Sequence, residues 1–139
     1  MIEDLKKHEN TADYFYEIRA IDRKPSFKNL SKIERASRII YLNKTCYNGL
    51  YRVNNAGEFN SPFGKYKNPN IVNEPIIRAV SKYLNTSKIQ ILSGDYEEVL
   101  KDIPINSFVY LDPPYHPLSD SSNFTGIYKE AGQKKIKFV

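Results

Sequence analysis

The chain has 139 residues, the length of one domain or of part of a larger one. Lys and Arg total 21 against 16 Asp and Glu, giving a net charge of +5 and a pI near 9.2. Nucleic acid is the commonest partner that uses such an excess. Cys46 stands alone, which excludes an intrachain disulfide, and no metal-ligand spacing is present. No apolar run approaches the ~20 residues of a membrane span, and the polar start differs from a secretory signal, so we expect a cytoplasmic protein.

The first half of the chain is expected to be helical. Residues 1–19 have the composition of a polar helix with weak periodicity. A firmer helix begins at Ser31, because Ser31-x-x-Glu34 matches a capping box. Its buried stripe is predicted to contain Ile33, Ala36, Ile39 and Ile40.

Residues 43–70, "NKTCYNGLYRVNNAGEFNSPFGKYKNPN", lose this periodicity. Long loops of this kind are usually either functional or disordered. The aromatic side chains argue against disorder here, and aromatics interleaved with basic residues suit stacking on bases. These aromatics are Tyr47, Tyr51, Phe59, Phe63 and Tyr66.

The second half of the chain predicts alternating helices and strands. A helix is expected from its cap Asn73 to about Leu84, followed by a buried strand at 88–92, "KIQIL". A turn with a short helix, "GDYEEVLKDI", then leads to a second strand at 107–111, "SFVYL". This order favours a parallel pair in an α/β sheet. Because two strands alone cannot form a stable α/β domain, we expect part of a larger fold.

The stretch Asp112-Pro113-Pro114-Tyr115 follows directly after the second predicted strand. Prolines end a strand, and open α/β sheets bind ligands at the carboxyl ends of their strands. The Asp112 carboxylate and the Pro113 carbonyl could accept hydrogen bonds from the exocyclic amine of adenine while Tyr115 stacks on the extruded base. Such an arrangement would suit methylation of that amine, because the acceptors favour the positive charge that develops on its nitrogen. The methyl group would come from a sulfonium cofactor. The alternative is an ordinary loop that happens to hold these residues.

Two long blocks, "YLNKTCYNGLYRVNNAGEFNSPFGKYKNP" and "FVYLDPPYHPLSDSSNFT", resemble the Dam-type (D12 class) N6-adenine DNA methyltransferases and their restriction-modification relatives that methylate GATC. The likeness runs from about residue 13 to about residue 128. It implies methyl transfer from S-adenosylmethionine to adenine in double-stranded DNA. It also implies an α/β fold, an incomplete Rossmann-like methyltransferase fold with a mainly helical and loop-rich DNA-recognition region. Residues 1–86 would form that recognition region, and residues 87–139 would form a partial catalytic unit. As in restriction-modification systems, a cognate restriction endonuclease could accompany the enzyme, and the sequence leaves this open.

The resemblance assigns DNA contacts to the first block. Arg52 aligns with an arginine that reads a guanine, in keeping with bidentate arginine–guanine geometry. The other aligned positions are Tyr47, Asn48 and Leu50, which contact or intrude into the duplex near the flipped adenine, Pro62 at a base edge, and Lys65 and Tyr66 at phosphates. Without the resemblance, a glycine-bearing loop with surface aromatics would be the simpler interpretation.

In the second block, Asp112 aligns with a residue that contacts both the cofactor and the target amine. Asp95, in "SGDY", aligns with an acidic position near the cofactor, and a helix N-cap is the alternative interpretation. Asn123 and Phe124 align with a segment that bounds the base pocket, and ordinary loop residues are the alternative there.

The sequence departs from the family in one block. Family members open with a Phe-x-Gly-x-Gly turn that cradles the methionine part of S-adenosylmethionine. Here no two glycines lie closer than Gly126 and Gly132, and the family's acidic residue for the ribose is missing too. We therefore expect the middle of such an enzyme, cut at each end.

Three alternatives remain beside an adenine methyltransferase. One is a DNA-binding remnant without catalysis, which the missing glycine-rich turn favours. Another is a fragment that does not fold alone. The third, methylation of a protein glutamine or an RNA guanine, is disfavoured because those relatives commonly begin the corner with Asn where this chain has Asp112.

Overall fold

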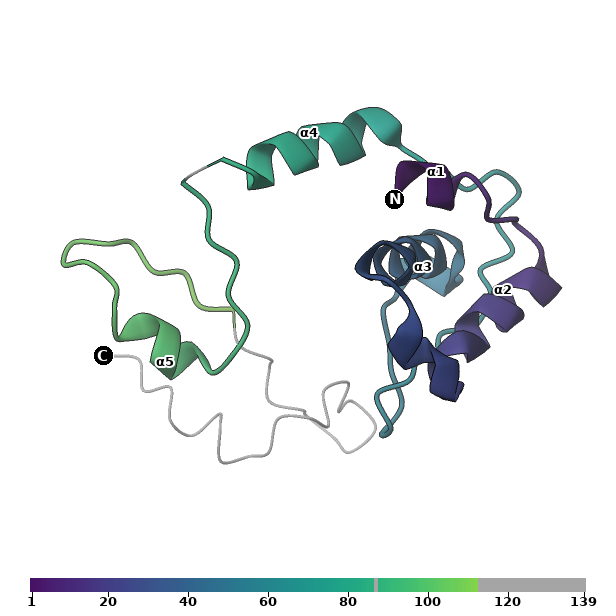
Figure 1. The fold of residues 1–139 in the computed structure, drawn as a ribbon, viewed down its shortest axis with the longest axis horizontal. Helices are drawn as coiled ribbons and strands as arrows, with labels where there is room; N and C mark the ends of the chain where they lie inside the picture. Colours follow the sequence, from purple (N-terminus) through teal and green to yellow (C-terminus); the bar gives the residue numbers. More distant parts are fainter. Residues whose placement is uncertain (87, 113–139) are drawn as a thin grey trace. The chain divides into compact units, whose positions relative to one another are not determined.

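A computed structural model describes residues 1–86 and 88–112 (Figure 1). The chain divides into two compact units, Met1–Ile89 and Gln90–Val139. The first unit contains the helices α1 (Ile2–Leu5), α2 (Ala12–Ala20), α3 (Lys32–Thr45) and α4 (Glu74–Leu84), with short 3₁₀ turns at Ile21–Arg23, Pro25–Asn29 and Tyr47–Gly49. The second contains α5 (Tyr96–Leu100).

The polar helix predicted over residues 1–19 is two helices, α1 and α2. A new helix begins after Thr11, whose hydroxyl accepts the N–H of Tyr14 at 3.4 Å. Such a cap satisfies one of the N–H groups that a helix start leaves without a partner. Leu5 of α1 and Phe15 of α2 are both fully buried, so the break packs two short helices into one core.

Helix α3 begins as predicted, with a complete capping box. Ser31 Oγ accepts the N–H of Glu34 at 3.2 Å, and the Glu34 carboxylate accepts the N–H of Ser31 at 2.8 Å. The predicted buried stripe is wrong, since Ile33 is 55 % exposed, Ala36 is exposed, and Ile39 and Ile40 are only half-buried. The buried face consists of Ser37, Arg38, Tyr41, Leu42 and Thr45. Polar residues interrupt this face, so an apolar pattern could not reveal it.

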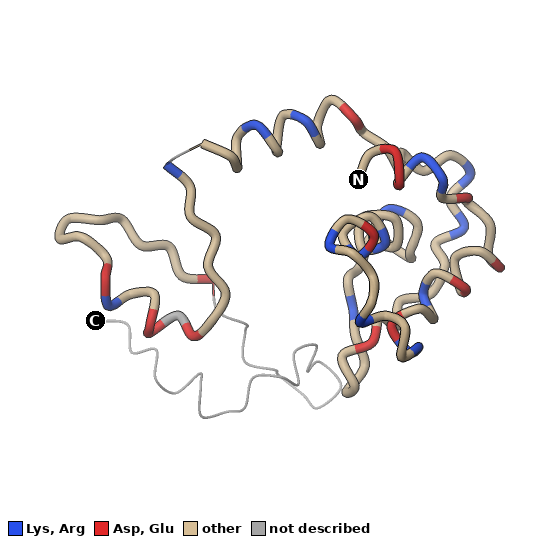
Figure 2. Tube along the Cα trace, viewed as in Figure 1, with Lys and Arg blue, Asp and Glu red and all other residues tan. Residues whose placement is uncertain are grey.

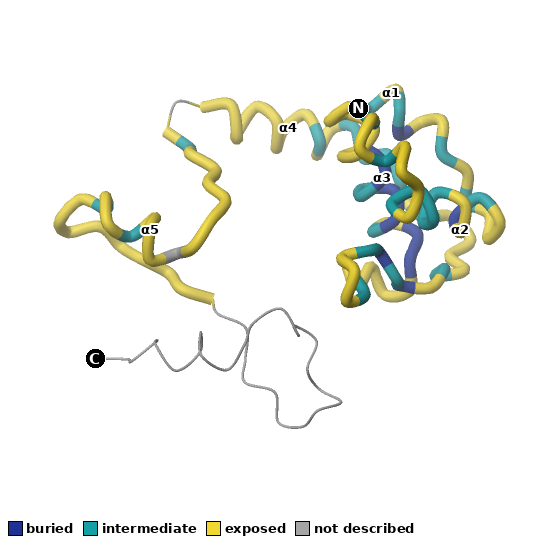
Figure 3. The backbone as a smooth tube through the Cα atoms, turned by 60° about the horizontal axis from the view of Figure 1, so that its bottom comes forward, coloured by how far each residue is buried: buried dark blue, intermediate teal, exposed yellow. Residues whose placement is uncertain are grey.

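The core of the first unit forms where α1 and α2 pack on α3. Its fully buried apolar members are Leu5, Phe15, Tyr41, Leu42, Cys46 and Phe59. Tyr41 satisfies its hydroxyl by donating to the Glu9 carbonyl at 2.9 Å, and burial raises the pKa of Tyr41 to about 12. Among the described residues, the buried ones all belong to this unit (Figure 3).

Helix α4 has the predicted cap, because Asn73 Oδ1 accepts the N–H of Ile76 at 3.4 Å. Ile77 packs against the core. Other apolar side chains of α4 face solvent, since Ile76, Val80 and Tyr83 are 57 %, 49 % and 67 % exposed. No helix in residues 1–86 and 88–112 is long and apolar enough to cross a membrane.

The two strands predicted in the second half do not form in the described part of the chain. At 88–92 and 107–111 the structure has no strand. Ile89 and Ser107 instead donate their N–H groups to Thr86 and Pro104, three residues back, at 3.3 and 3.2 Å. A strand needs a neighbour to pair its backbone groups, and Phe108 is 92 % exposed where a covered sheet face was expected. The predicted parallel pair is therefore wrong for the described residues, and the incomplete Rossmann-like fold stays a prediction.

Candidate nucleic-acid interface

Residues 46–63 form an antiparallel hairpin that leaves the carboxyl end of α3. Isolated bridges join Cys46 to Phe63 and Val53 to Phe59. Three hydrogen bonds link the limbs between these bridges: Tyr47 N–H to the Pro62 carbonyl at 2.8 Å, the Ser61 hydroxyl to the Leu50 carbonyl, and Asn60 N–H to the Arg52 carbonyl at 2.9 Å. We call this segment the 46–63 hairpin.

The tip of the hairpin is shaped by Asn54. Its side-chain oxygen accepts the N–H groups of Ala56 and Glu58, each at 3.0 Å, and its amide donates to the Glu58 carboxylate at 2.7 Å. Asparagine closes turns in this way. Gly57 supplies the positive φ of 79° that the turn requires.

The base of the hairpin depends on Gly64. A Cβ atom at this position would lie 2.5 Å from Tyr66 Cε2 and 2.7 Å from the Cys46 carbonyl oxygen. Gly64 also donates its N–H to the Thr45 carbonyl at 2.8 Å, which ties the hairpin to the end of α3. Only glycine allows this close approach of two backbone segments.

The hairpin and the residues that follow it present the predicted DNA contacts to solvent. Tyr47 is 57 % exposed, and Leu50 is 46 % exposed. All seven predicted contacts in this unit are exposed: Tyr47, Asn48, Leu50, Arg52, Pro62, Lys65 and Tyr66. The backbone bond between Tyr47 and Pro62 places these two positions opposite each other across the hairpin. The structure thus brings predicted contacts on the two limbs of the hairpin close together.

Arg52 is held by a residue that the sequence did not single out. Its Nε donates to Asn60 Oδ1 at 2.8 Å. The two terminal NH₂ groups of this guanidinium have no partner among the residues that the structure describes. Asn60 lies eight positions further along the chain and meets Arg52 only once the hairpin forms, so no local sequence signal could have found it.

The hairpin is anchored to the helices by a second set of residues that sequence reasoning missed. Asp22 Oδ2 accepts both the N–H of Phe59 and a guanidinium N–H of Arg38, each at 2.8 Å. The Asp22 and Arg38 side chains are 9 % and 4 % exposed. Removing one partner of a buried ion pair costs about 3–5 kcal/mol, so this contact ties the hairpin firmly to the helices.

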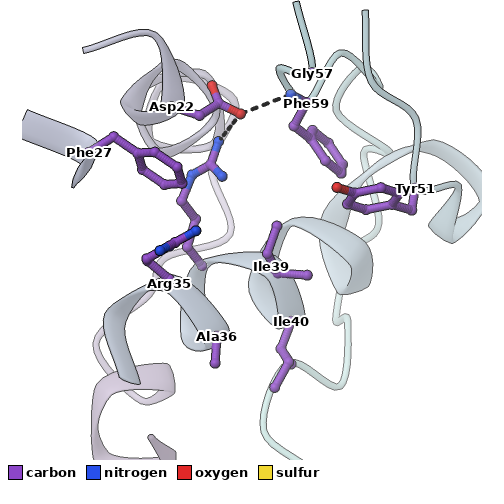
Figure 4. Close-up of a pocket in the computed structure, with 10 residues that line it drawn as sticks. Asp22, Phe27, Arg35, Ala36, Ile39, Ile40, Tyr51, Gly57 and Phe59 are labelled. Atoms are coloured by element: carbon purple, nitrogen blue, oxygen red, sulfur yellow. Dashed lines mark hydrogen bonds and ion pairs between the residues drawn. The ribbon is translucent and has the colours of Figure 1, made fainter. Parts of the chain in front are cut away.

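An open pocket of about 570 Å³ lies beside this anchor. Figure 4 shows the Asp22 carboxylate beside Phe59, with Phe27, Ile39 and Tyr51 around it. The ring of Tyr51 meets that of Phe59 edge-on at 5.7 Å. The pocket therefore marks the seam between the hairpin and the helices that support it.

Basic residues outnumber acidic ones in residues 43–70, which include the hairpin. Figure 2 marks the charged residues along the chain. Residues 43–70 contain Lys44, Arg52, Lys65 and Lys67 against a single acid, Glu58. The Glu58 carboxylate accepts a hydrogen bond from Asn54 and lies 3.6 Å from the Arg23 guanidinium. A surface with this balance is suited to the phosphates of DNA.

The predicted catalytic and cofactor residues belong to the second unit. Asp95 is the N-cap of α5, with its Oδ1 accepting the N–H of Glu97 at 2.9 Å. Asp112 is exposed. The other predicted residues, Pro113, Pro114, Tyr115, Asn123 and Phe124, lie outside the described residues.

The described part of the second unit does not by itself enclose a cofactor such as S-adenosylmethionine. Between residues 90 and 112 the described side chains are exposed, except for the half-buried Leu100 and Ile103. An exposed carboxylate such as Asp112 does not by itself enclose a cofactor. Within residues 1–86 and 88–112, no three His, Cys, Asp or Glu side chains cluster as a metal site would need.

Known proteins similar to the chain are DNA methyltransferases. The chain is 46 % identical over 132 residues to the type II methyltransferase M1.LlaDCHI of Lactococcus lactis subsp. cremoris, covering 94 % of this chain and 46 % of that protein. It is 46 % identical over 121 residues to the type II methyltransferase M.MjaIII of Methanocaldococcus jannaschii, covering 87 % and 41 %. It is 35 % identical over 119 residues to the DNA adenine methylase of Escherichia coli K12, covering 86 % and 40 %.

The match extends to a whole family. The model of the D12 class N6 adenine-specific DNA methyltransferases matches residues 1–137. The chain belongs to this family, as the resemblance predicted. It spans less than half the length of the relatives described above.

Proposed function

We propose that the chain carries the target-recognition part and the catalytic corner of an enzyme that methylates N6 of adenine in double-stranded DNA, with GATC as its site. The observation that carries this proposal is the exposed Arg52 on the 46–63 hairpin, held at its Nε by Asn60. Family membership supplies the reaction class. The hairpin supplies a chemical basis for reading the site.

Arg52 is suited to read a guanine from the major groove. A guanine presents two acceptors there, O6 and N7, and an arginine contacts both at once. Because Asn60 occupies Nε, the two terminal NH₂ groups are left as the donors for such a contact. Such a preset guanidinium loses less side-chain freedom on binding than a mobile one would.

The residues beside Arg52 suit the remaining contacts with the duplex. An enzyme that acts on a base within a duplex must extrude that base, and an apolar or aromatic side chain fills or flanks the space. Leu50 and Tyr47 are exposed on the same hairpin. Lys65 and Tyr66, directly after it, are proposed to contact phosphates.

Asp112 is proposed as an acceptor for the amine of the target adenine. A carboxylate hydrogen-bonded to that amine stabilises the positive charge that develops on nitrogen as it is methylated. The methyl donor proposed from family membership is S-adenosylmethionine. Asp95 is proposed near the donor, Pro113, Pro114 and Tyr115 at the catalytic corner, and Asn123 near the target base.

A second candidate is site-specific DNA binding without methyl transfer. The distribution of buried residues favours it. In the described residues, the hairpin rests on a buried core that includes Phe59, whereas Asp112 is exposed and no cofactor cradle surrounds it.

Binding and turnover experiments on the purified chain separate the two candidates. Fluorescence anisotropy would compare a short duplex containing GATC with one in which the same four bases are permuted. Transfer of a labelled methyl group from S-adenosylmethionine would then be measured on the GATC duplex. Preference for GATC with methyl transfer supports the methyltransferase, and preference without transfer supports the binding module. Equal affinity for both duplexes would contradict either proposal.

A further inference from the structure

We propose that Asp22 is a positioning residue for DNA recognition, because it fixes the hairpin strand that orients Arg52. This inference rests on the proposed function, since it assigns Asp22 a part in the specificity of the same site. Asp22 lies 30 positions before Arg52 in the sequence and outside every motif that pointed to DNA.

Asp22 is itself held in place by the end of helix α2. Arg38 donates from Nε to the Ile18 carbonyl at 2.9 Å and from an NH₂ group to the Arg19 carbonyl at 2.8 Å. These carbonyls belong to the last turn of α2, where a helix leaves its acceptors without internal partners and favours a cation. Arg38 is therefore fixed by the helix end, and Asp22 is fixed by Arg38 at 2.8 Å.

The same carboxylate then holds the hairpin at Phe59 (Figure 4). Asp22 accepts the N–H of Phe59 at 2.8 Å, and the neighbouring Arg23 donates to the Phe59 carbonyl at 2.9 Å. The Phe59 side chain is 1 % exposed and cannot rotate away without leaving the core. Both backbone groups and the side chain of this one residue are thus fixed to the helices.

Phe59 passes this constraint to Arg52 through Asn60. Asn60 follows Phe59 directly, donates its N–H to the Arg52 carbonyl at 2.9 Å, and accepts from Arg52 Nε at 2.8 Å. A displacement of Phe59 consequently moves both contacts that orient the guanidinium. Readout of a base edge requires side chains held to within about half an ångström, so a small displacement is enough to weaken it.

Two variants, each with a matched control, test the role of Asp22: Asp22→Ala is compared with Leu5→Ala, and Arg23→Met is compared with Lys24→Met. Asp22→Ala removes the acceptor for Phe59, and Leu5→Ala lowers stability from the core while leaving every polar contact of the Asp22 anchor in place. Arg23→Met removes the donor to the Phe59 carbonyl and the ion pair of Arg23 with Asp22 Oδ1 at 2.7 Å, but keeps the buried pair of Asp22 and Arg38, so we expect it to lower stability less than Asp22→Ala does. Lys24→Met removes the same charge from an exposed neighbour that makes no such contact. Each variant is studied below its melting temperature, as measured by circular dichroism.

Two readouts are taken on every variant of the full chain. Amide hydrogen exchange at Phe59 and Asn60 reports on the anchor without DNA. The ratio of affinities for the GATC duplex and the permuted duplex, at fixed salt, reports on recognition. We expect Asp22→Ala to speed exchange at both amides and to lower the affinity ratio by about tenfold. Arg23→Met should act in the same direction more weakly, and Asp22→Asn, which keeps an acceptor oxygen, should restore part of the ratio.

The controls decide the outcome. Leu5→Ala and Lys24→Met should keep the affinity ratio of the natural chain, and the natural chain's overall salt dependence should persist in Asp22→Ala. Unchanged exchange at Phe59 in Asp22→Ala, or an unchanged affinity ratio in both Asp22→Ala and Arg23→Met, would overturn the inference while leaving the proposed function intact. A natural chain that does not discriminate between the duplexes would instead overturn the proposed function, and with it the role of Asp22 in specificity.

Discussion

His8 is a partly buried residue of the first unit whose ring makes polar contacts on both sides. Its Nδ1 lies 2.9 Å from the Tyr14 hydroxyl, its Nε2 lies 3.3 Å from Ser37 Oγ, and its ring stacks on Tyr41 at 4.5 Å. Burial lowers the pKa of His8 below its usual 6.5, while nearby Asp4 opposes this change. The folded protein therefore binds a proton at His8 less readily than the unfolded chain does.

This lowered pKa predicts acid sensitivity of the first unit. Because the unfolded chain holds more protons at this site, the contribution of His8 to stability is fully present above about pH 6.5. It is lost as the pH falls from there through the folded-state pKa. Urea unfolding above and below this window should show a larger loss of stability on acidification in the natural chain than in His8→Gln. An equal loss in both proteins would contradict the assignment.

Asn60, which holds the proposed DNA contact Arg52, offers a prediction of its own. Asn60→Ala removes the acceptor for Arg52 Nε, so the guanidinium gains freedom that must be lost again on binding. We expect the preference for the GATC duplex to weaken by about 0.5–1.5 kcal/mol, which is the scale for ordering one long side chain. Titrating the natural chain and the variant with the GATC duplex and with the permuted duplex would measure this change in preference. Asn55→Ala, an exposed change at the hairpin tip, is the control, and a matching loss there would exclude a specific role for Asn60.

At the scale of elements, the hairpin depends on the close approach at Gly64. Gly64→Ala would place a Cβ atom 2.7 Å from the Cys46 carbonyl oxygen, which is backbone and cannot move aside alone. We expect a loss of about 1–3 kcal/mol in unfolding free energy, the usual cost of overpacking. Gly94→Ala is the matched control, because nothing lies within 4 Å of the added atom. Equal stability of the two variants would mean that the hairpin base is looser than described.

The elements also show what a sequence can and cannot predict. The starts of α3 and α4 were predictable, because Ser31 and Asn73 bond N–H groups only three residues away. The buried face of α3 was not, because its polar member Arg38 is buried only in company with Asp22, which lies far off in the sequence. The prediction of strands at 88–92 and 107–111 was wrong for a related reason. A strand depends on a neighbouring strand, which its own residues do not specify.

The same division holds for the candidate site. Arg52 and its exposed neighbours could be predicted because long sequence blocks resemble a family, and family membership is confirmed. Asn60 and Asp22 could not, because each acts through a contact that exists only in the folded hairpin. Which side chains contact DNA thus stays a prediction from residue motifs, and only the structure indicated what holds these side chains in place.

At the scale of the whole molecule, the buried residues that the structure describes all lie in the first unit, and Cys46 can report on this core. Its thiol is buried, with Sγ 3.6 Å from the Leu50 carbonyl and 3.8 Å from the Asn43 carbonyl, and burial raises the pKa of Cys46. Because the thiolate is the reactive form, a thiol reagent should label the native chain slowly and the urea-unfolded chain fast. Rapid labelling without denaturant would show that the first unit does not hold the described core in isolation.

The central claim is that Arg52 reads a guanine through its major-groove edge. The most direct test replaces the guanine of GATC by 7-deazaguanine, which lacks the N7 acceptor, and measures affinity for the natural chain and for Arg52→Ala. We expect the base change to weaken binding by the natural chain, within the ~1–3 kcal/mol of a bidentate contact, and to leave binding by Arg52→Ala unaffected. If the base change weakens both proteins equally, or neither, Arg52 does not contact N7 and the account is wrong.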